Sequence, residues 1–402
     1  MKIVLITIGQ PSTNPRLIKE ANALTDAGHE VIVLYCFWID WAFKADEKIL
    51  ATVKWKFQLV GGSPYTNRLL FLYTKIELKA FAFLNKWIGN KYGIAEIAQA
   101  KCYSQLLKYA KSIKADWYIG HILGSLPVAV KAALYNKAKA GFDFEDYHRA
   151  ENESMSKVDI RRITYLENKY VPHLQYISTA SPLIENKVRA NFPLLKMPVI
   201  TLLNSFPLSQ QPAYRKKELG DNTLQLFWFS QTVGNNRGLE MLIDALRELN
   251  NNNIYLTLAG RYTNEVLDSF KKRAAHMGTN IHFSGIIPPE KLPLFASKFD
   301  VGLALEPAFS TNNDIALSNK IFTYLLAGNA LLVSETSMQK AFIQEYKIGL
   351  SFPIDDMDRL KGIFEIYLKK DELDKQRMDS WQLANKTLNW ENESKKLLVI
   401  IK

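Results

Sequence analysis

Two cationic residues follow polar segments at points where a predicted strand is succeeded by a helix. Arg237 comes after SQTVGNN, residues 230–236, which follows the apolar run LQLFWF. Lys320 falls in the first turn of the predicted helix NKIFTYLLA, residues 319–327, after a polar loop at residues 310–314. A cation at a helix start opposes the helix dipole unless an anion offsets it, and helix starts also offer unpaired N–H groups. The repeated pattern therefore predicts a phosphate-bearing ligand.

Histidine and acidic residues follow predicted strands in the first half of the chain. His121 ends DWYIGH, where it can donate a hydrogen bond to a substrate hydroxyl or phosphate, although a purely structural histidine is the alternative. Asp143, Glu145, Asp146 and Arg149 crowd the segment FDFEDYHRAENE. This segment lacks a recognised spacing of metal ligands and contains no thiolate, so we expect it to bind substrate hydroxyls and expect no metal site.

The loop after the first strand, GQPSTNPRLIKEA, adds a third group of candidates. Gly9 permits a tight turn, Asn14 can cap the following helix, and Arg16 adds a cation. The loop lacks the G-x-G-x-x-G spacing, so a nicotinamide-dependent oxidoreductase is a weak alternative.

The composition of the chain limits the kinds of partner and the cellular location that we expect. The 402 residues carry a net charge of +11, with 27 Lys and Arg against 17 Asp and Glu in residues 1–205. Such a basic half suits nucleic acid, an anionic membrane surface or an acidic substrate. No helix-turn-helix, zinc module or RNA-binding aromatic motif is recognisable, so we expect no nucleic-acid partner. Cys36 and Cys102 lie far apart in the sequence and are expected to be reduced thiols. No apolar run is long enough to span a membrane, and the first strand is too short for a signal peptide. We therefore expect a cytoplasmic location.

Strand-like runs alternate with helical patterns throughout, which predicts an α/β protein with two Rossmann-like, doubly wound domains that face a cleft. The proline- and charge-rich segment SFPLSQQPAYRKKELGDN breaks the alternation. We therefore predict an N-terminal domain at residues 1–205, a linker at 206–222, a C-terminal domain at 223–385 and a last helix within 386–402.

Several segments in this order and spacing resemble the GT-B glycosyltransferases, specifically the retaining family 4 type. The most similar are PSTNPRLIKEANALTDAGHEVIVLY, DWYIGHILGSLPVAVKAA, FSQTVGNNRGLEMLIDAL, IHFSGIIPPEKLPLFASKFDVGLALEP and LSNKIFTYLLAGNALLVS. The resemblance implies transfer of a sugar from a nucleotide-sugar, bound by the C-terminal domain, to a glycan or lipid-linked acceptor, in bacterial-type cell-surface polysaccharide or glycoconjugate synthesis. It also implies that the last helix returns to the N-terminal domain and that the reaction needs no cofactor.

The resemblance carries over residue by residue. His121 matches the histidine beside the reacting sugar, and Arg237 and Lys320 would stabilise the departing phosphate. The positions expected to bind the donor are Ser230, Gln231, Gly234, Gly285, Ile286, Leu317, Ser318, Asn319 and Thr323. The positions expected to bind the acceptor are Gly9, Asn14, Arg16, Glu145, Asp146 and Arg149. The chain departs from the family pattern where Gln231 replaces an arginine and where Ile315 and Thr323 replace two glutamates. These departures make a non-catalytic sugar-nucleotide or glycan-binding protein the main alternative.

Residues 64–114 hold nine Lys and Arg, two acids and nine aromatic residues. On a helical projection, Arg68, Lys75, Lys79 and Lys86 share an arc of about 40°. This pattern predicts peripheral contact with an anionic membrane, such as the inner face of the cytoplasmic membrane, and the alternative is a core helix with a solvated basic face.

Overall fold

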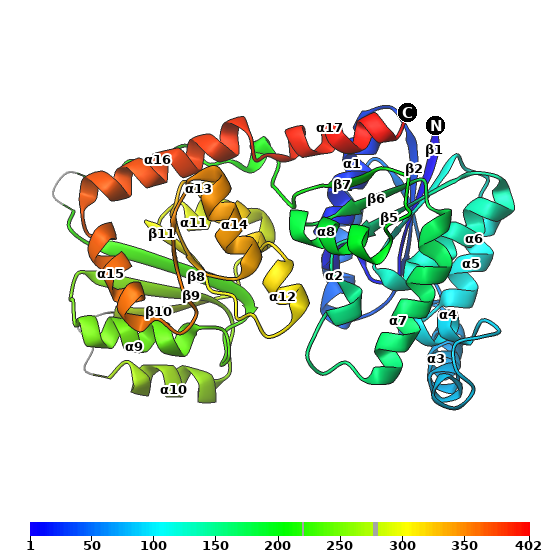
Figure 1. The fold of residues 1–402 in the computed structure, drawn as a ribbon, viewed down its shortest axis with the longest axis horizontal. Coiled ribbons are helices and arrows are strands. Elements are labelled where there is room, and N and C mark those ends of the chain that lie inside the picture. Colours follow the sequence, from blue (N-terminus) through cyan, green and yellow to red (C-terminus); the bar gives the residue numbers. More distant parts are fainter. Residues whose placement is uncertain (219–220, 276–279) are drawn as a thin grey trace. The chain divides into compact units, whose positions relative to one another are not determined.

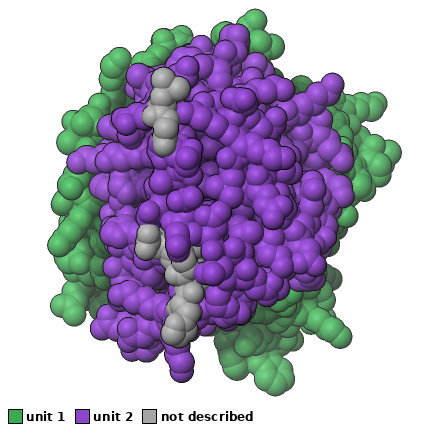
Figure 2. Space-filling model, turned by 90° about the vertical axis from the view of Figure 1, so that its left-hand side faces the viewer, with its two compact units in different colours: residues 1–202, 394–402 green, residues 203–393 purple. Residues whose placement is uncertain are grey.

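The chain forms two compact units, which Figure 2 distinguishes by colour. The computed structural model describes residues 1–218, 221–275 and 280–402. The first unit comprises residues 1–202 and 394–402, and the second comprises residues 203–393. The predicted linker at 206–222 falls in the second unit, except that its residues 219 and 220 lie outside the described residues.

The first unit contains a parallel sheet in the order β3-β2-β1-β4-β5-β6-β7 (Figure 1). Its strands are β1 (Lys2–Thr7), β2 (Glu30–Cys36), β3 (Lys56–Val60), β4 (Trp117–His121), β5 (Lys139–Phe144), β6 (Tyr176–Thr179) and β7 (Val199–Thr201). Its helices are α1 (Pro15–Asp26), α2 (Asp40–Leu50), α3 (Arg68–Ile88), α4 (Ile94–Gln99), α5 (Tyr103–Ser112), α6 (Leu126–Asn136), α7 (Lys157–Tyr170) and α8 (Pro182–Asn191).

The second unit contains a parallel sheet in the order β10-β9-β8-β11-β12-β13. Its strands are β8 (Leu224–Thr232), β9 (Ile254–Arg261), β10 (Asn280–Gly285), β11 (Val301–Ala304), β12 (Ala330–Ser334) and β13 (Leu350–Phe352). Its helices are α9 (Leu239–Leu249), α10 (Asn264–Arg273), α11 (Leu292–Ala296), α12 (Thr311–Ile315), α13 (Asn319–Ala327), α14 (Ser337–Tyr346), α15 (Met357–Tyr367) and α16 (Lys370–Lys386).

Both sheets are doubly wound, which confirms the prediction of two Rossmann-like domains. Each chain path starts at a central strand, β1 or β8, builds one half of its sheet outward and then returns to build the other half. The direction reverses between β1 and β4 and again between β8 and β11. In open sheets of this kind, ligands bind beyond the carboxyl ends of the strands at such a reversal point. The loops after these four strands are therefore the places to look for a site.

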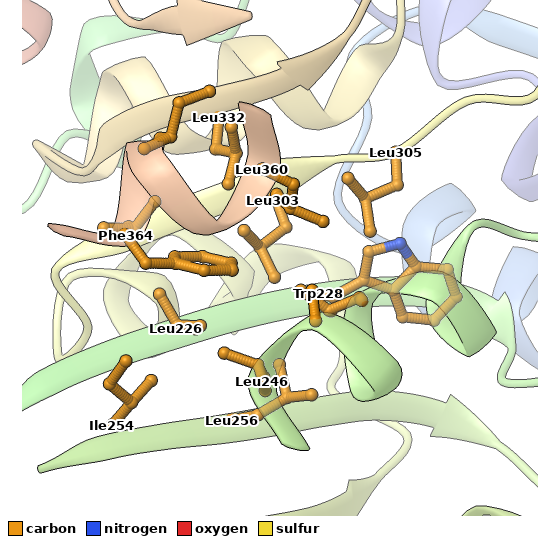
Figure 3. Close-up of a cluster of buried hydrophobic side chains, with 14 of the residues drawn as sticks. Leu226, Trp228, Leu246, Ile254, Leu256, Leu303, Leu305, Leu332, Leu360 and Phe364 are labelled. Atoms are coloured by element: carbon orange, nitrogen blue, oxygen red, sulfur yellow. The ribbon is translucent and has the colours of Figure 1, made fainter. Parts of the chain in front are cut away.

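The core of the second unit explains why its strands read as apolar runs. In Figure 3, Leu226 and Trp228 of β8 pack with Leu303 of β11 and with Leu360 and Phe364 of α15. All five side chains are buried. Helices cover both faces of a parallel sheet, so its strands are apolar on both sides and do not alternate.

The last helix, α17 (Trp390–Ile400), begins in the second unit, and from Ser394 onward its residues belong to the first. Leu397 and Ile401 are buried in the same core as Ile3, Leu5 and Trp117. The C-terminal segment therefore contributes apolar side chains to the core of the first unit.

Two strands, β3 and β13, were not apparent from the sequence. Both are short edge strands, and the first three residues of β3 are exposed. An edge strand with a solvated face lacks the apolar run that marks a central strand.

Cys36 and Cys102 are free and buried. No helix in the described parts of the chain is long and apolar enough to cross a membrane.

Candidate functional site

A cavity of about 250 Å³ lies at the reversal point of the second sheet, where β8 and β11 end. Both cations singled out from the sequence, Arg237 and Lys320, line it. The remaining lining residues are Trp228, Asn235, Asn236, Leu305, Glu306, Pro307, Phe309 and Asn313. The two cationic positions are more than 80 residues apart in the chain, and the sheet brings them together.

Arg237 is positioned by a left-handed turn immediately before α9. Asn236 and Gly238 have φ angles of 60° and 75°, and Gly238 is the N-cap residue of α9. Arg237 therefore precedes the helix and does not lie in its first turn, which corrects the expectation that it opens the helix. Its Nη1 donates a hydrogen bond to Oγ of Ser230, 3.1 Å away, which orients the guanidinium from the end of β8.

Lys320 does lie in the first turn of α13, as expected, but its partner is a residue that the sequence did not single out. Its Nζ is 2.6 Å from Oε1 of Glu306, which follows β11. Burial alone would raise the pKa of Glu306, but the charge and hydrogen bond of Lys320, the hydrogen bond from Ser318 and the charge of Arg237 together lower it. In this structure, then, the anion that offsets Lys320 is a carboxylate. The available signal was a carboxylate at the end of the predicted strand DVGLALE.

Ser318 occupies the predicted N-cap position of α13, but its side chain does not cap the helix. Its Oγ donates a hydrogen bond to Oε1 of Glu306 at 2.7 Å. At the other end, Gly328 terminates the helix with a φ of 74°, as predicted. The polar residues expected to form a loop instead form the short helix α12, with Ser310 as its N-cap, and Asn313 of that helix reaches the cavity.

The other positions expected to bind the donor are more dispersed. Gln231 is exposed near the end of β8, whereas Thr323 and Leu317 are buried, as is Ile315. Asn319 is exposed and accepts a hydrogen bond from Asn204 at 2.9 Å. Gly285 ends β10 and Ile286 follows it, two strands away from β8, and Gly234 lies in the loop before Arg237. The structure thus places Arg237 and Lys320 in the cavity wall, with Ser230 and Ser318 hydrogen-bonded to lining residues, and the binding roles of all these positions stay predictions.

In the first unit, a buried ionic network occupies the corresponding reversal point between β1 and β4. Arg16 donates from Nε and Nη2 to the two carboxylate oxygens of Asp143, at 2.6 and 2.8 Å. Ser178 donates to Asp143 at 2.6 Å, and Arg16 Nη1 donates to the carbonyl of Leu202. Arg16 and Asp143 are almost completely buried. The positive charge of Arg16 and bonds from neighbouring groups hold the pKa of Asp143 well below its usual range although burial opposes this.

His121 completes this network between two carboxylates. Its Nε2 is 3.3 Å from Glu20 and its Nδ1 is 3.5 Å from Asp143, and the ring is fully buried. Burial alone would lower the pKa of His121, but Glu20 and Asp143 raise it to about 10. The network therefore pairs two cations with two anions. Because the ring is enclosed, the predicted contact of His121 with a sugar would require it to leave these partners, and that contact stays a prediction.

Glu20 was not identified from the sequence, although it lies four residues after Arg16 on α1 and both face the interior. Ligand atoms of Glu20, His121 and Asp143 lie within 4.8 Å of one another, a grouping that can hold a metal ion. Arg16 and Ser178 already occupy both oxygens of Asp143. The residues present therefore balance their own charges.

The remaining acceptor candidates lie in the segments that follow β1 and β5. Gly9 and Asn14 are buried, and Asn14 caps α1 by accepting from the backbone N–H of Leu17 at 3.0 Å, as predicted. Arg149 donates to Glu167 at 2.5 Å. Glu145 and Asp146 are half-buried after β5. Burial and the charge of Asp143 raise the pKa of Glu145 to about 7, so this side chain could exchange a proton near neutral pH.

Neither a protein-family model nor a curated protein sequence matches the chain. Solved structures do match it over its whole length. HepE from Anabaena, in complex with UDP and glucose, has 13% identity and a TM-score of 0.69, with 100% of this chain and 99% of that chain covered. Sucrose-phosphate synthase from Thermosynechococcus elongatus has 12% identity and a TM-score of 0.67, with 100% and 98% covered. A variant of S. aureus TarM, in complex with fondaparinux, alpha-GlcNAc-glycerol and UDP, has 11% identity and a TM-score of 0.67, with both chains covered completely. These likenesses show that the chain has the GT-B fold.

Proposed function

We propose that this chain is a glycosyltransferase that transfers a sugar from a nucleotide-sugar donor to a glycan or lipid-linked acceptor. The observation that carries the proposal is the meeting of Arg237 and Lys320 in one cavity at the reversal point of the second sheet. Two cations at such a point, beside the start of α9, suit the diphosphate of a nucleotide-sugar. The complexes of HepE and TarM with UDP make uridine nucleotides the first donors to test.

The proposed chemistry is largely electrostatic. The bond between the sugar and the phosphate breaks while an acceptor hydroxyl forms a bond on the same face of the sugar, and the hydroxyl proton passes to the departing phosphate. The reaction therefore retains the anomeric configuration, as the resemblance to family 4 implies. Negative charge builds on the departing phosphate, where Arg237 and Lys320 would stabilise it. Loss of one such cation should cost about 2.7–4 kcal/mol in the transition state, by analogy with oxyanion donors. With both cations supplied by the protein, we expect transfer to continue in the presence of a chelator.

Glu306 gives Lys320 two states. In the present structure, Lys320 is paired with Glu306, so the cavity carries one net positive charge from its three ionised side chains. A bound diphosphate would share Lys320 with Glu306 or draw it away. Glu306 therefore weakens non-specific anion binding and leaves full engagement of Lys320 to a ligand that fits the cavity.

A second candidate is a non-catalytic protein that binds sugar-nucleotides or glycans. It is favoured by the burial of Ile315 and Thr323 at the positions where the family carries carboxylates, since neither residue presents a charge for a ribose or sugar. Under either function we place the protein in cell-surface polysaccharide or glycoconjugate synthesis in the cytoplasm, on the strength of the sequence resemblance.

A thermal-shift titration tests the donor site directly. The wild-type chain and Arg237→Ala are titrated with UDP, GDP, ADP, CMP and dTDP sugars. Arg247→Ala is the matched control, because Arg247 lies on α9 but pairs with Asp244 on the surface. One nucleotide series should raise the melting temperature of the wild type and of the control, but not that of Arg237→Ala. A ligand at 100 times its dissociation constant stabilises the folded state by about 2.7 kcal/mol, which such a titration detects.

Turnover separates the two candidate functions. The donor that binds is incubated with candidate acceptors, release of the nucleoside diphosphate is measured, and the product anomer is assigned by NMR. Binding without release would favour the non-catalytic protein. If no nucleotide-sugar shifts the wild type, the donor proposal fails.

A further inference from the structure

The outer face of α3 is apolar and exposed. Its exposed fractions are 82% for Leu69, 67% for Ile76, 62% for Phe83 and 76% for Trp87. Large apolar side chains are rarely exposed together in this way unless another surface covers them. The basic face of the helix is solvated, as the alternative expects, but Ile76, Phe83 and Trp87 face solvent and do not belong to a core.

The inner face of the same helix attaches it to the unit. Phe71, Thr74 and Asn85 are buried, and the Phe71 ring packs edge-on against the ring of Phe37 at 5.5 Å. Lys101 Nζ lies 4.0 Å from the centroid of the Phe71 ring. Because these contacts set the rotation of the helix, its apolar face is exposed as a consequence of tertiary packing.

The cations of α3 border this apolar face. At about 100° per residue, Arg68, Lys75, Lys79 and Lys86 lie along one edge of the stripe that Leu72, Phe83, Ile76 and Trp87 form. All four cations are exposed. The single acidic residue of the helix, Glu77, lies on its other side, where it accepts a hydrogen bond from Ser104 at 2.9 Å. The exposed surface therefore combines apolar and positively charged side chains without an acid among them.

We propose that the outer face of α3 binds the surface of an anionic phospholipid bilayer, with the helix axis parallel to the membrane. Phe83, Trp87, Ile76 and Leu69 would enter the boundary between headgroups and acyl chains, and the lysines would contact the headgroups. The helix has 21 residues, so it would extend for about 32 Å along the surface. A second copy of the chain is a poorer occupant, because it would bring two cationic edges together. This proposal does not depend on transferase activity.

Vesicle co-sedimentation tests it. The full chain is mixed with neutral vesicles of phosphatidylcholine, or with anionic vesicles in which phosphatidylglycerol makes up one third of the lipid. Each mixture is prepared at low and at high salt. The wild type should bind the anionic vesicles at low salt and be released by high salt. Lys75→Gln/Lys79→Gln/Lys86→Gln should lower the partition coefficient about 100-fold, since each lysine near the surface contributes about fivefold. Phe83→Ser/Trp87→Ser should lower it at least tenfold.

Matched controls separate membrane contact from general effects. Leu134→Ser/Tyr135→Ser removes two exposed apolar side chains from α6, and Lys114→Gln/Lys187→Gln/Lys196→Gln removes the same charge elsewhere on the unit. Both controls should bind vesicles as the wild type does, and all variants should retain the wild-type melting temperature. Failure of the wild type to bind anionic vesicles would overturn the proposal, as would wild-type binding by Phe83→Ser/Trp87→Ser. A dimer that this variant converts to a monomer in light scattering without lipid would assign the face to self-association instead.

Discussion

The pair formed by Lys320 and Glu306 permits a test that separates structural from ligand-binding roles. The two side chains are 13% and 25% exposed, and their charged atoms are 2.6 Å apart. Breaking a fully buried pair by removing one partner costs about 3–5 kcal/mol, whereas an exposed pair contributes about 0.2–1 kcal/mol. For this partly exposed pair we expect Lys320→Met to lower the free energy of unfolding by about 2 kcal/mol, because Glu306 is left with Ser318 as its nearest donor.

The double variant should cost less than the two single variants together. Glu306→Gln alone should cost about 1–2 kcal/mol, because it leaves the Lys320 ammonium without its carboxylate. Lys320→Met/Glu306→Gln leaves neither charge unpaired, so its cost should be smaller than the sum by about 1–2 kcal/mol. Urea unfolding of the four proteins, followed by circular dichroism, measures this coupling.

The pH dependence of stability tests independently whether the pairing of Lys320 with the ionised Glu306 is stabilising. Because the pKa of Glu306 is lowered in the fold, its ionisation stabilises the protein above the ordinary value of 4.5, and that contribution is lost as the pH falls through the folded value. The penalty of Lys320→Met should therefore be largest near neutral pH and should shrink in acid. A penalty that grows in acid would contradict this account of the pair.

Nucleotide binding should not follow stability. Both variants that lack Lys320 should lose the stabilisation by UDP that we expect of the wild type, including the double variant, whose loss of stability is smaller than the sum of the single losses. Glu306→Gln should bind UDP more tightly, because it frees Lys320 and removes a negative charge from the cavity. Strictly additive stabilities, or wild-type binding of UDP by the double variant, would refute the reasoning that Lys320 serves both the fold and the donor.

Two further outcomes follow from packing and charge in the rest of the molecule. The pKa of His121 is raised from 6.5 to about 10. The charge of His121 therefore stabilises the first unit fully below pH 6.5 and progressively less as the pH rises to 10. Relative to His121→Asn, the free energy of unfolding of the wild type should fall by no more than about 5 kcal/mol across this range, as measured by unfolding at a series of pH values. In the second unit, a Cβ at Gly302 would lie 2.1 Å from the Tyr324 ring, so Gly302→Ala should lower the free energy of unfolding by about 1–3 kcal/mol. A Cβ at Gly362, within α15, meets nothing within 4 Å, so Gly362→Ala should raise the free energy of unfolding by about 0.5–1 kcal/mol. Calorimetry of both variants checks this contrast, and equal effects would contradict it.

Local patterns were enough to predict most of the fold. Apolar runs such as KIVLIT and ALLVS arise because both faces of a parallel sheet are buried. Such strands can therefore be predicted without knowing which strands lie beside them in the sheet. Helix ends are equally local, and Asn14 and Gly328 cap α1 and α13 as their residue types predict. The edge strands β3 and β13 were not predicted because β3 is largely exposed and β13 has only three residues, so neither forms an apolar run.

The same locality explains what could be said of the candidate site. The cations Arg237 and Lys320 stood out because each was predicted at a helix start, where a cation opposes the helix dipole. Their convergence in one cavity depends on the order of β8 and β11 in the sheet, which no local pattern specifies.

Partnerships across the chain were decided by tertiary structure alone. Glu306 neutralises Lys320 from a neighbouring strand end, and Glu20 and Asp143 enclose His121 from α1 and β5. The exposed side of α3 likewise depends on how Phe71 packs against Phe37. The sequence by itself determined which residues are charged, apolar or able to cap a helix, because those are properties of residues and their near neighbours. Only the tertiary structure decided which charges meet and which apolar face stays in solvent, because these depend on segments that are distant in the chain.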